Sequence, residues 1–226
     1  MAEQRWVPLE SNPVVLTKYI HNLGSPDDWQ FVDVYGLEDD LLMMVPRPVA
    51  ALMLLYPCTK KVEDNPIGTV SPDLTDSVYF IKQSIRNACG TIAIVHALAN
   101  NANSIKFDAD KYFSKFIEET KNMSPSERAQ FLEKDKNMGN IHEESAMEGQ
   151  TRAPSSEESV NPHFVAFINK NGKLFEMDGR KDGPIDHGKT TPDTFLSDAA
   201  KVVQQFMKRD PDELNFNVMA LVKTKD

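Results

Sequence analysis

The chain has 226 residues, of which 40% are hydrophobic and 26% are charged, a balance typical of a globular protein that can bury a sizeable core. The formal net charge of -9 disfavours binding to nucleic acid or to an anionic membrane and favours a basic partner. Two cysteines are too few for a disulfide framework, so a reducing, cytoplasmic or also nuclear, location is expected. No signal peptide and no membrane-spanning stretch is predicted.

Periodicity and helix-end signals predict a mixture of helices and strands. Asn12 can cap the first helix, which begins at Pro13 and ends before Gly24, and a capping box opens another helix at Ser124. Helices are expected at 13–23, 41–44, 88–99, 108–123, 125–134 and 192–209, strands at 29–35, 49–56, 77–81 and 215–223, a hairpin across 161–178 and a surface loop at 60–75. Because the elements do not alternate regularly, the expected fold class is α+β (mixed α/β), in a single domain spanning 1–226.

A long polar segment, 135–160, stands apart from the rest of the chain. It is rich in Glu, Ser, Gly and Asn and has few apolar residues. Irregular loops of more than about 12–15 residues are uncommon inside compact domains, so this segment is either a functional lid or a mobile insertion. It runs directly into the predicted strand that carries His163, and this position favours the lid.

Cys89 lies in the sequence Asn87-Ala-Cys-Gly-Thr91, at the start of the helix predicted at 88–99. Unpaired backbone N–H groups and the helix dipole at such a position lower the pKa of a thiol, and the thiolate is the reactive nucleophile. This location makes Cys89 a candidate nucleophile. An inert, buried cysteine is the alternative interpretation of the same pattern.

His163 and Asp178 lie on the two strands of the predicted hairpin. A turn centred on 170–171 would place them directly opposite each other, within the roughly 4.5–5.5 Å that separates opposed Cβ atoms. A turn centred on 171–172 would place His163 opposite Arg180 and make Asp178 a diagonal neighbour on the same face. In either register the carboxylate can orient the imidazole and stabilise its protonated form, although a purely structural pair would give the same pattern.

The other histidines are less suggestive. His96 falls within a predicted buried helix and is expected to be a core residue, whereas His21, His142 and His187 are expected at surface or loop positions. The sequence has no CxxC or HExxH spacing and no Gly-rich phosphate loop, so no metal ion and no cofactor is expected. A Cys–His–Asp hydrolase is therefore the catalytic set that the residues offer.

A series of short motifs, spread in order over the whole chain, resembles one known family. The motifs are Arg5-Trp-Val-Pro-Leu-Glu10, Phe31-Val-Asp-Val-Tyr-Gly36, Val45-Pro-Arg-Pro48, Val78-Tyr-Phe-Ile-Lys-Gln83, Asn87-Ala-Cys-Gly-Thr91, His142-Glu-Glu-Ser145, Glu148-Gly-Gln150, Leu174-Phe-Glu-Met-Asp-Gly-Arg-Lys181 and Arg209-Asp-Pro-Asp-Glu-Leu214. In these segments the chain resembles the ubiquitin carboxyl-terminal hydrolases, which are papain-like cysteine deubiquitinases, and is most similar to the small members of that family.

The resemblance implies a mechanism and a fold. Cys89 matches the family's nucleophile, His163 its general base, Asp178 the carboxylate that orients the base, and Gln83 the side chain of the oxyanion hole. The implied fold is a papain-like core with a central, mostly antiparallel sheet surrounded by helices. The implied chain is knotted, and a crossover loop at about 135–160 passes over the active site.

The resemblance also implies ubiquitin as the partner of a monomeric enzyme. Ubiquitin is expected to dock near Pro8, Leu9 and Leu214, with its basic C-terminal tail beside Glu10 and Asp33. Pro162, beside the catalytic histidine, and Val14 depart from the family's residues at positions that are similar to ubiquitin contacts, and Ala93 replaces a family glycine. The differences at Pro162 and Val14 concern ubiquitin affinity, and none of the three changes the catalytic set.

The length of the crossover loop bears on the adducts that the enzyme could release. About 25 residues of roughly 3.4 Å each would give a contour of about 85 Å, or a ring about 27 Å across. Small leaving groups and short peptides are therefore the expected adducts. Two alternatives remain open: a ubiquitin-binding protein with little turnover, and a hydrolase of a ubiquitin-like modifier such as NEDD8.

Overall fold

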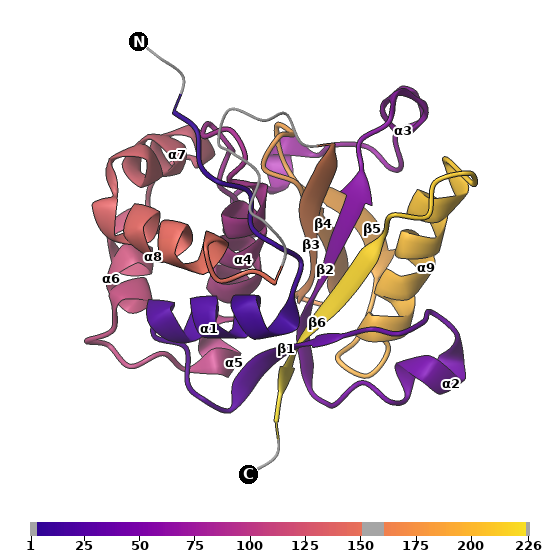
Figure 1. Ribbon diagram of the computed structural model, residues 1–226, viewed down its shortest axis with the longest axis horizontal. Coiled ribbons are helices and arrows are strands. Elements are labelled where there is room, and N and C mark those ends of the chain that lie inside the picture. The colour runs from indigo at the N-terminus through magenta and orange to yellow at the C-terminus, as the bar shows by residue number, and fades with distance from the viewer. Residues whose placement is uncertain (1–3, 151–160, 225–226) are drawn as a thin grey trace.

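The computed structural model describes residues 4–150 and 161–224, and within them six strands form one sheet (Figure 1). The strands are β1 (Trp29–Asp33), β2 (Val49–Pro57), β3 (Pro162–Lys170), β4 (Lys173–Met177), β5 (Ile185–Lys189) and β6 (Asn217–Lys223). Their order across the sheet is β1-β6-β2-β3-β4-β5, and every neighbouring pair is antiparallel. The predicted mixed α/β class with a mostly antiparallel sheet is therefore confirmed.

Helices cover both faces of the sheet, each over its own hydrophobic cluster (Figure 1). One face carries α1 (Pro13–Leu23), α4 (Cys89–Asn100), α5 (Ala102–Ile105), α6 (Tyr112–Thr120), α7 (Pro125–Lys134) and α8 (Lys136–Ala146). The other face carries α2 (Asp39–Leu42) and α9 (Phe195–Lys208), while α3 (Lys60–Asp64) and a 3-10 turn (Pro72–Leu74) follow β2. The family's knot would depend on the path of residues 151–160, which lie outside the described residues.

Local signals explain the elements that the sequence predicts well. The Asn12 side chain accepts a hydrogen bond from the Val14 N–H at 3.0 Å and caps α1, and Gly24 ends the helix with a φ of 102°, a backbone conformation that favours glycine. The capping box of Ser124 and Glu127 is present at α7. β2 is buried along most of its length, as its continuous apolar run predicts.

Two predictions in the first half of the chain are wrong. Segment 77–81 is not a strand, because α4 side chains satisfy its backbone: the Tyr79 N–H donates to Asn100 Oδ1 at 2.8 Å and the Ile81 N–H to His96 Nε2 at 3.1 Å. Segment 60–75 is not only a loop, because it contains α3, which the Thr59 side chain caps, and the 3-10 turn. These errors arise because propensity describes neighbours in sequence and not contacts in space.

The expected irregular segment 135–160 is also corrected, because its first part is helical. α8 occupies Lys136–Ala146, and the Asp135 carboxylate caps it by accepting from the Asn137 and Met138 N–H groups. The helix was missed because its buried face is narrow and mostly small or polar. Its irregular continuation begins at Met147. Residues 151–160 of the expected crossover lie outside the described residues.

The hairpin adopts the second of the two expected registers. Lys170 pairs with Lys173 and Ala166 with Met177, so the turn is centred on 171–172, where both residues have a positive φ of 53° and 75°. This is the backbone conformation of the two-residue hairpin turns that match strand twist. β5, which follows the hairpin, was not predicted.

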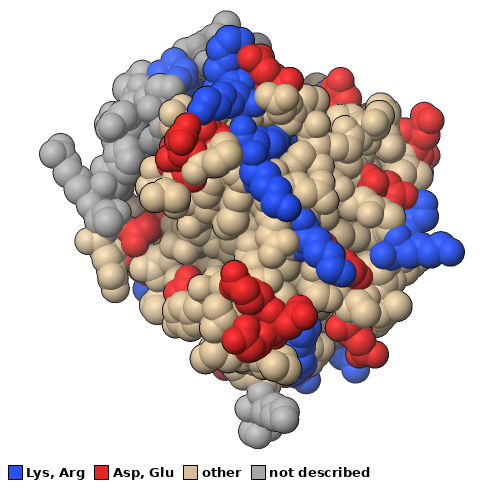
Figure 2. Space-filling view, turned by 90° about the vertical axis from the view of Figure 1, so that its right-hand side faces the viewer, with Lys and Arg blue, Asp and Glu red and all other residues tan. Residues whose placement is uncertain are grey.

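The surface is not uniformly acidic. Figure 2 shows Lys and Arg side chains in a diagonal band on the face that α9 covers, with Asp and Glu side chains beside it. Ion pairs join Lys61 of α3 to Asp210 at 2.8 Å and Lys201 of α9 to Asp198 at 3.1 Å, so these two lysines have acidic partners close by. Of the helices in the described parts of the chain, none is long and apolar enough to cross a membrane.

Candidate active site

One end of the sheet gathers the predicted catalytic residues. Because the strands are antiparallel, β2 ends where β3 begins, and β4 also ends there. His163 is the second residue of β3 and lies opposite Tyr56, while Asp178 follows the last residue of β4. α4 packs against β3 and begins with Cys89. Residues that are far apart in the sequence therefore meet at this end.

His163 and Asp178 form a buried hydrogen-bonded pair. His163 Nε2 lies 2.7 Å from Asp178 Oδ1, and both side chains are only 4% exposed. Burial opposes charge on the imidazole, but hydrogen bonds to Asp178 and Cys89 outweigh it and raise the pKa of His163 to about 10. Burial likewise opposes charge on the carboxylate, yet the hydrogen bond from His163 lowers the pKa of Asp178 to about 2. The pair is therefore imidazolium and carboxylate at neutral pH.

Cys89 completes this chain of contacts. Its half-buried thiol is hydrogen-bonded to His163, and since Nε2 of that ring faces Asp178, the nitrogen toward the sulfur is Nδ1. Burial disfavours the thiolate, but His163 and the backbone N–H groups of Phe164 and Gly90 outweigh it, so the pKa of Cys89 is lowered. A thiolate beside an imidazolium is the reactive form of a cysteine nucleophile.

Gln83 is held beside the turn that follows Asp178. Its backbone N–H donates to the Gly179 carbonyl at 2.8 Å, and its side-chain Nε2 donates to the Ile85 carbonyl at 3.1 Å. A Cβ at Gly179 would lie 2.5 Å from Ile92 Cγ2 and 3.1 Å from the Gln83 nitrogen. Gly179 is thus a site residue that sequence reasoning missed, although it stands inside the Leu174–Lys181 motif.

Arg180 is a second site residue that the sequence did not single out. Its backbone N–H donates to Asp178 Oδ1 at 3.0 Å, the oxygen that also faces His163. Its guanidinium Nη1 lies 3.3 Å from the sulfur of Cys58. The tight turn after β4 therefore fixes the carboxylate through the backbone, which residue types alone do not reveal.

The expected ubiquitin contacts lie near the same end of the sheet but differ in exposure. Leu214, before β6, is 86% exposed, and Pro162, at the start of β3, is also exposed. Pro8, Glu10 and Asp33 are half-buried. Leu9 is only 7% exposed, because it packs on Gly90 and in the core. A ubiquitin contact at Leu9 would therefore be made mainly by its backbone.

The structure confirms the core position predicted for His96 but not the surface or loop positions predicted for His142 and His187. His96 is fully buried and accepts from the Ile81 N–H, as expected of a core residue. The prediction of a surface or loop position is wrong for His142, which is 1% exposed within α8. It is also wrong for His187, which lies in β5 and places Nε2 2.9 Å from the buried carboxylate of Glu176. His21 lies on α1 and is half-buried.

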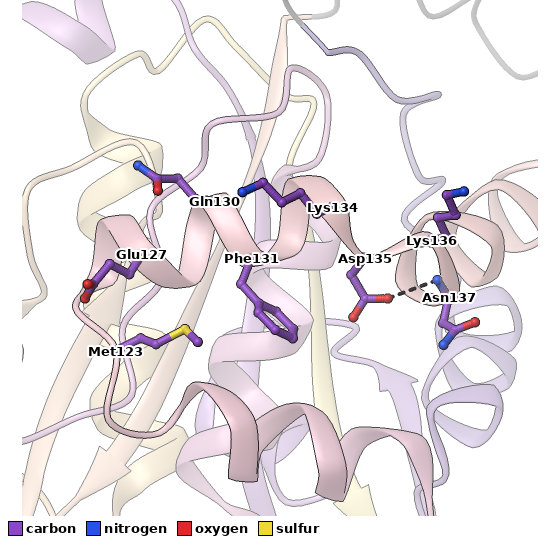
Figure 3. A pocket seen from close by; sticks show the side chains of 8 residues that line it. All are labelled: Met123, Glu127, Gln130, Phe131, Lys134, Asp135, Lys136 and Asn137. Atoms are coloured by element: carbon purple, nitrogen blue, oxygen red, sulfur yellow. Dashed lines mark hydrogen bonds between the residues drawn. The ribbon is translucent and has the colours of Figure 1, made fainter.

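One hollow of the described surface lies away from the predicted catalytic residues. A hollow of about 670 Å³ lies along α7 and the start of α8, where Phe131 and Met123 form its apolar part and the Asn137 N–H donates a hydrogen bond to the Asp135 carboxylate (Figure 3). None of its lining residues belongs to the predicted catalytic set. Within 4–150 and 161–224, no three His, Cys, Asp or Glu side chains are grouped so that they could hold a metal ion.

A nucleophile–base–carboxylate chain at the start of a helix defines a cysteine hydrolase, and the comparisons with known proteins agree. Residues 6–208 match the model of ubiquitin carboxyl-terminal hydrolase, family 1. The chain is 58% identical over 211 residues to a ubiquitin carboxyl-terminal hydrolase of Aplysia californica, which covers 93% of this chain and 99% of that protein. The chain belongs to this family of cysteine peptidases.

Other relatives agree along nearly the whole chain. A Drosophila melanogaster ubiquitin carboxyl-terminal hydrolase is 47% identical over 223 residues, 96% of each chain. The human isozyme L1 is 42% identical over 224 residues, 96% of this chain and 97% of that protein. Among solved structures, the Trichinella spiralis UCH37 catalytic domain bound to ubiquitin vinyl methyl ester matches with a TM-score of 0.82 and 25% identity, covering 100% of this chain and 98% of that one.

Proposed function

We propose that this chain is a deubiquitinating thiol hydrolase that cleaves adducts from the C-terminal glycine of ubiquitin. The observation that carries the proposal is the continuous contact from the Cys89 thiol through the His163 imidazole to Asp178. The names of its relatives, and the ubiquitin derivative bound to a solved family member, supply the substrate.

The reaction is a two-step acyl transfer. The Cys89 thiolate attacks the terminal glycine carbonyl, and the Cys89 backbone N–H together with the side-chain amide of Gln83 stabilises the oxyanion. The His163 imidazolium gives its proton to the leaving amine, which leaves a thioester on Cys89. The neutral imidazole then takes a proton from water, the hydroxide attacks the thioester, and the thiolate departs with release of the ubiquitin carboxylate. Asp178 keeps the imidazole oriented throughout.

The side-chain amide of Gln83 has one of its two N–H groups free for the oxyanion role. One amide hydrogen is used by the Ile85 carbonyl, so the second amide N–H is the one that can reach an oxyanion. Its Oε1 is buried and has no hydrogen-bond partner within the described residues. An amide held on one side in this way keeps its orientation before substrate binds, which is what electrostatic stabilisation requires.

Small adducts and short peptides are the preferred leaving groups. α8 takes up the first part of the predicted crossover segment, 135–160, so about 14 of its residues are left to pass over the site. About 14 residues have a contour of about 48 Å, or a ring about 15 Å across. Such a ring is narrower than the ring of about 27 Å expected from the sequence, and a folded domain could not pass through it. The proposal includes the crossover itself, for which the family resemblance is the support.

Ubiquitin would dock against Pro8, Leu9, Pro162 and Leu214, with its basic tail beside Glu10 and Asp33. The acidic pair favours a positively charged tail by electrostatic complementarity. The chain acts as a single catalytic domain over 1–226, since both hydrophobic clusters pack on the same sheet, and the family resemblance is the support for a monomer. Its two free thiols suit a reducing compartment, the cytoplasm or nucleus. NEDD8 is the alternative substrate for the same chemistry.

Turnover of a fluorogenic ubiquitin C-terminal amide by the wild type and by Cys89→Ala tests the proposal. Loss of the nucleophile should lower kcat by about 10⁴-fold or more, because the covalent route is removed, while binding of ubiquitin is retained. Turnover by the Ala variant would overturn the assignment of Cys89. Labelling of the wild type by ubiquitin and by NEDD8, each with an electrophilic C-terminus, ranks the two substrates, and binding without labelling would instead show a ubiquitin-binding protein.

A further inference from the structure

Residues 4–10, called the strap here, lie across the start of the helix that carries Cys89. The Trp6 N–H donates to the Arg86 carbonyl at 3.0 Å, and the Asn87 side-chain amide donates to the Trp6 carbonyl at 3.2 Å. Further along, Leu9 packs so closely on Gly90 that a Cβ there would lie 3.0 Å from Leu9 Cδ1. The strap therefore contacts residues on both sides of the nucleophile, and it also carries three of the proposed ubiquitin contacts.

His142 of α8 holds the middle of the strap through a chain of buried hydrogen bonds. Its Nε2 lies 2.7 Å from the Val7 carbonyl and its Nδ1 lies 2.7 Å from Thr91 Oγ1, which in turn is 2.8 Å from the Tyr19 hydroxyl. A carbonyl can only accept, so Nε2 carries the proton and Nδ1 accepts from Thr91. Thr91 then accepts from Tyr19, and every donor direction in the chain is fixed.

The strap has little other support from the helix beneath it. The Trp6 ring contacts the His142 ring with centroids 4.3 Å apart. Around these two side chains, however, a hollow of about 380 Å³ separates the strap from α8 and the end of α7. Trp6 and Leu9 themselves are buried in the core cluster, so the hollow leaves the hydrogen bond from His142 as a buried polar contact that joins α8 to the middle of the strap. The bond from His142 to Val7 is therefore an anchor for the strap.

The far end of the strap meets the chain that continues from the same helix. A Cβ at Gly149 would lie 2.3 Å from Glu10 Oε2, and Lys18 of α1 pairs with Glu148 at 2.5 Å. α8 and residues 147–150 thus contact the strap at Val7 and again at Glu10. α8 therefore adds to the contacts at Arg86, Asn87 and Gly90 that place the proposed docking residues relative to Cys89.

We propose that His142 is a positioning residue that fixes the strap over the first turn of α4, so that its hydrogen bond to Val7 sets the affinity for ubiquitin without setting the reactivity of Cys89. The inference rests on the proposed function for its ligand. It does not require turnover, because the partners of the thiol are His163 and the N–H groups of Phe164 and Gly90, none of which belongs to the strap.

Two substitutions separate the two hydrogen bonds of His142. A glutamine amide nitrogen reaches roughly as far as Nε2 of histidine, so His142→Gln keeps the donor to Val7 and loses the acceptor for Thr91. An asparagine oxygen lies roughly where Nδ1 lies, so His142→Asn keeps the acceptor and leaves the Val7 carbonyl without its donor. Both variants replace the imidazole by an amide, and besides the hydrogen bond that each one keeps they differ by one methylene group, which is absent from asparagine.

The test measures ubiquitin binding to both variants in a Cys89→Ala background and KM and kcat in the active enzyme. His142→Asn should raise the Kd and KM about 3- to 10-fold, the effect expected for one hydrogen bond, with kcat and the rate of Cys89 alkylation by iodoacetamide unchanged. His142→Gln should stay closer to wild type in both constants. Equal losses in the two variants, or a parallel fall of kcat and alkylation rate, would overturn the proposal.

Hydrogen exchange of the strap amides keeps this inference separate from the proposed function. Exchange at residues 4–10 should rise in His142→Asn and much less in His142→Gln, whether or not ubiquitin is the ligand. If the wild type binds no ubiquitin but the two variants differ in exchange as expected, the proposed function is contradicted and the role of His142 in holding the strap still stands. Unchanged exchange in His142→Asn would refute the anchor even if ubiquitin is cleaved.

Discussion

His163, at the start of β3, and His142, on α8, are both almost inaccessible to solvent, and their surroundings move their pKa values in opposite directions. Burial lowers the pKa of His142 to about 4, and the Val7 carbonyl opposes this only weakly. At His163 burial acts in the same sense, but Asp178 and Cys89 reverse it and raise the pKa to about 10. Burial alone therefore yields a neutral imidazole, and a charged partner is needed for an imidazolium.

The difference separates two uses of one side chain. A neutral imidazole donates from one nitrogen and accepts at the other, and His142 uses both to join the strap to α4. An imidazolium donates from both nitrogens, and His163 directs them at Asp178 and Cys89. The first arrangement suits the positioning role proposed for His142, and the second suits the proton transfer proposed for His163.

The largest expected effect comes from removing the charge that distinguishes the two sites. Asp178→Asn keeps a hydrogen-bond acceptor for His163 but removes the carboxylate, so kcat should fall by about 10²- to 10⁴-fold. The pKa of His163 should fall and that of Cys89 should rise, which narrows the pH–rate profile from both sides. Profiles of kcat/KM for both proteins measure this. An unchanged width would show that Asp178 does not set the charge of the pair.

A smaller effect should appear in the pH dependence of stability. His96 and His142 both have their pKa lowered from 6.5 to about 4, chiefly by burial, so between these values the unfolded chain binds protons that the folded chain does not. Their stabilising contribution is complete above pH 6.5 and is lost as the pH falls toward 4, by about 3 kcal/mol for each histidine. His163 is charged in both the folded and the unfolded chain between pH 4 and 6.5, so it should not contribute to the pH dependence of the free energy of unfolding in this range.

Guanidinium unfolding of the wild type and of His142→Gln at pH 7.0 and pH 4.5 measures the contribution of His142. The variant should lose less free energy of unfolding between the two pH values than the wild type, because it lacks one of the two histidines whose pKa the fold lowers. Identical losses would mean that the neutral state of His142 is not maintained by the fold.

The smallest expected effect concerns the hollow between the strap and α8. A Cβ at Gly139, inside α8, would find only Trp6 Cζ2 at 3.9 Å, an ordinary contact. Gly139→Ala should therefore stabilise the protein by about 0.5–1 kcal/mol through helix propensity, with KM and kcat unchanged. Denaturant unfolding and steady-state kinetics check this, and a raised KM would show that the strap packs on α8 more tightly than the hollow implies.

The sequence predicted elements with strong local signals and failed where distant side chains intervene. α1, β2, α4 and α7 were predicted from caps and apolar runs. The false strand at 77–81 has a strand-like composition, but Asn100 and His96 of α4 bind its backbone. α8 was missed because its burial depends on packing against α1 and not on an apolar stripe of its own.

For the candidate site, the sequence by itself determined that Cys89 stands at a helix start and that His163 and Asp178 share one face of a hairpin. It did so because caps, turns and strand alternation are properties of neighbouring residues. Only the tertiary structure decided that α4 packs on β3 and brings Cys89 to His163, that Gly179 couples Gln83 to the turn after Asp178, and that His142 is buried beneath the strap. These are contacts between distant segments, which depend on how helices and sheet pack and not on local sequence.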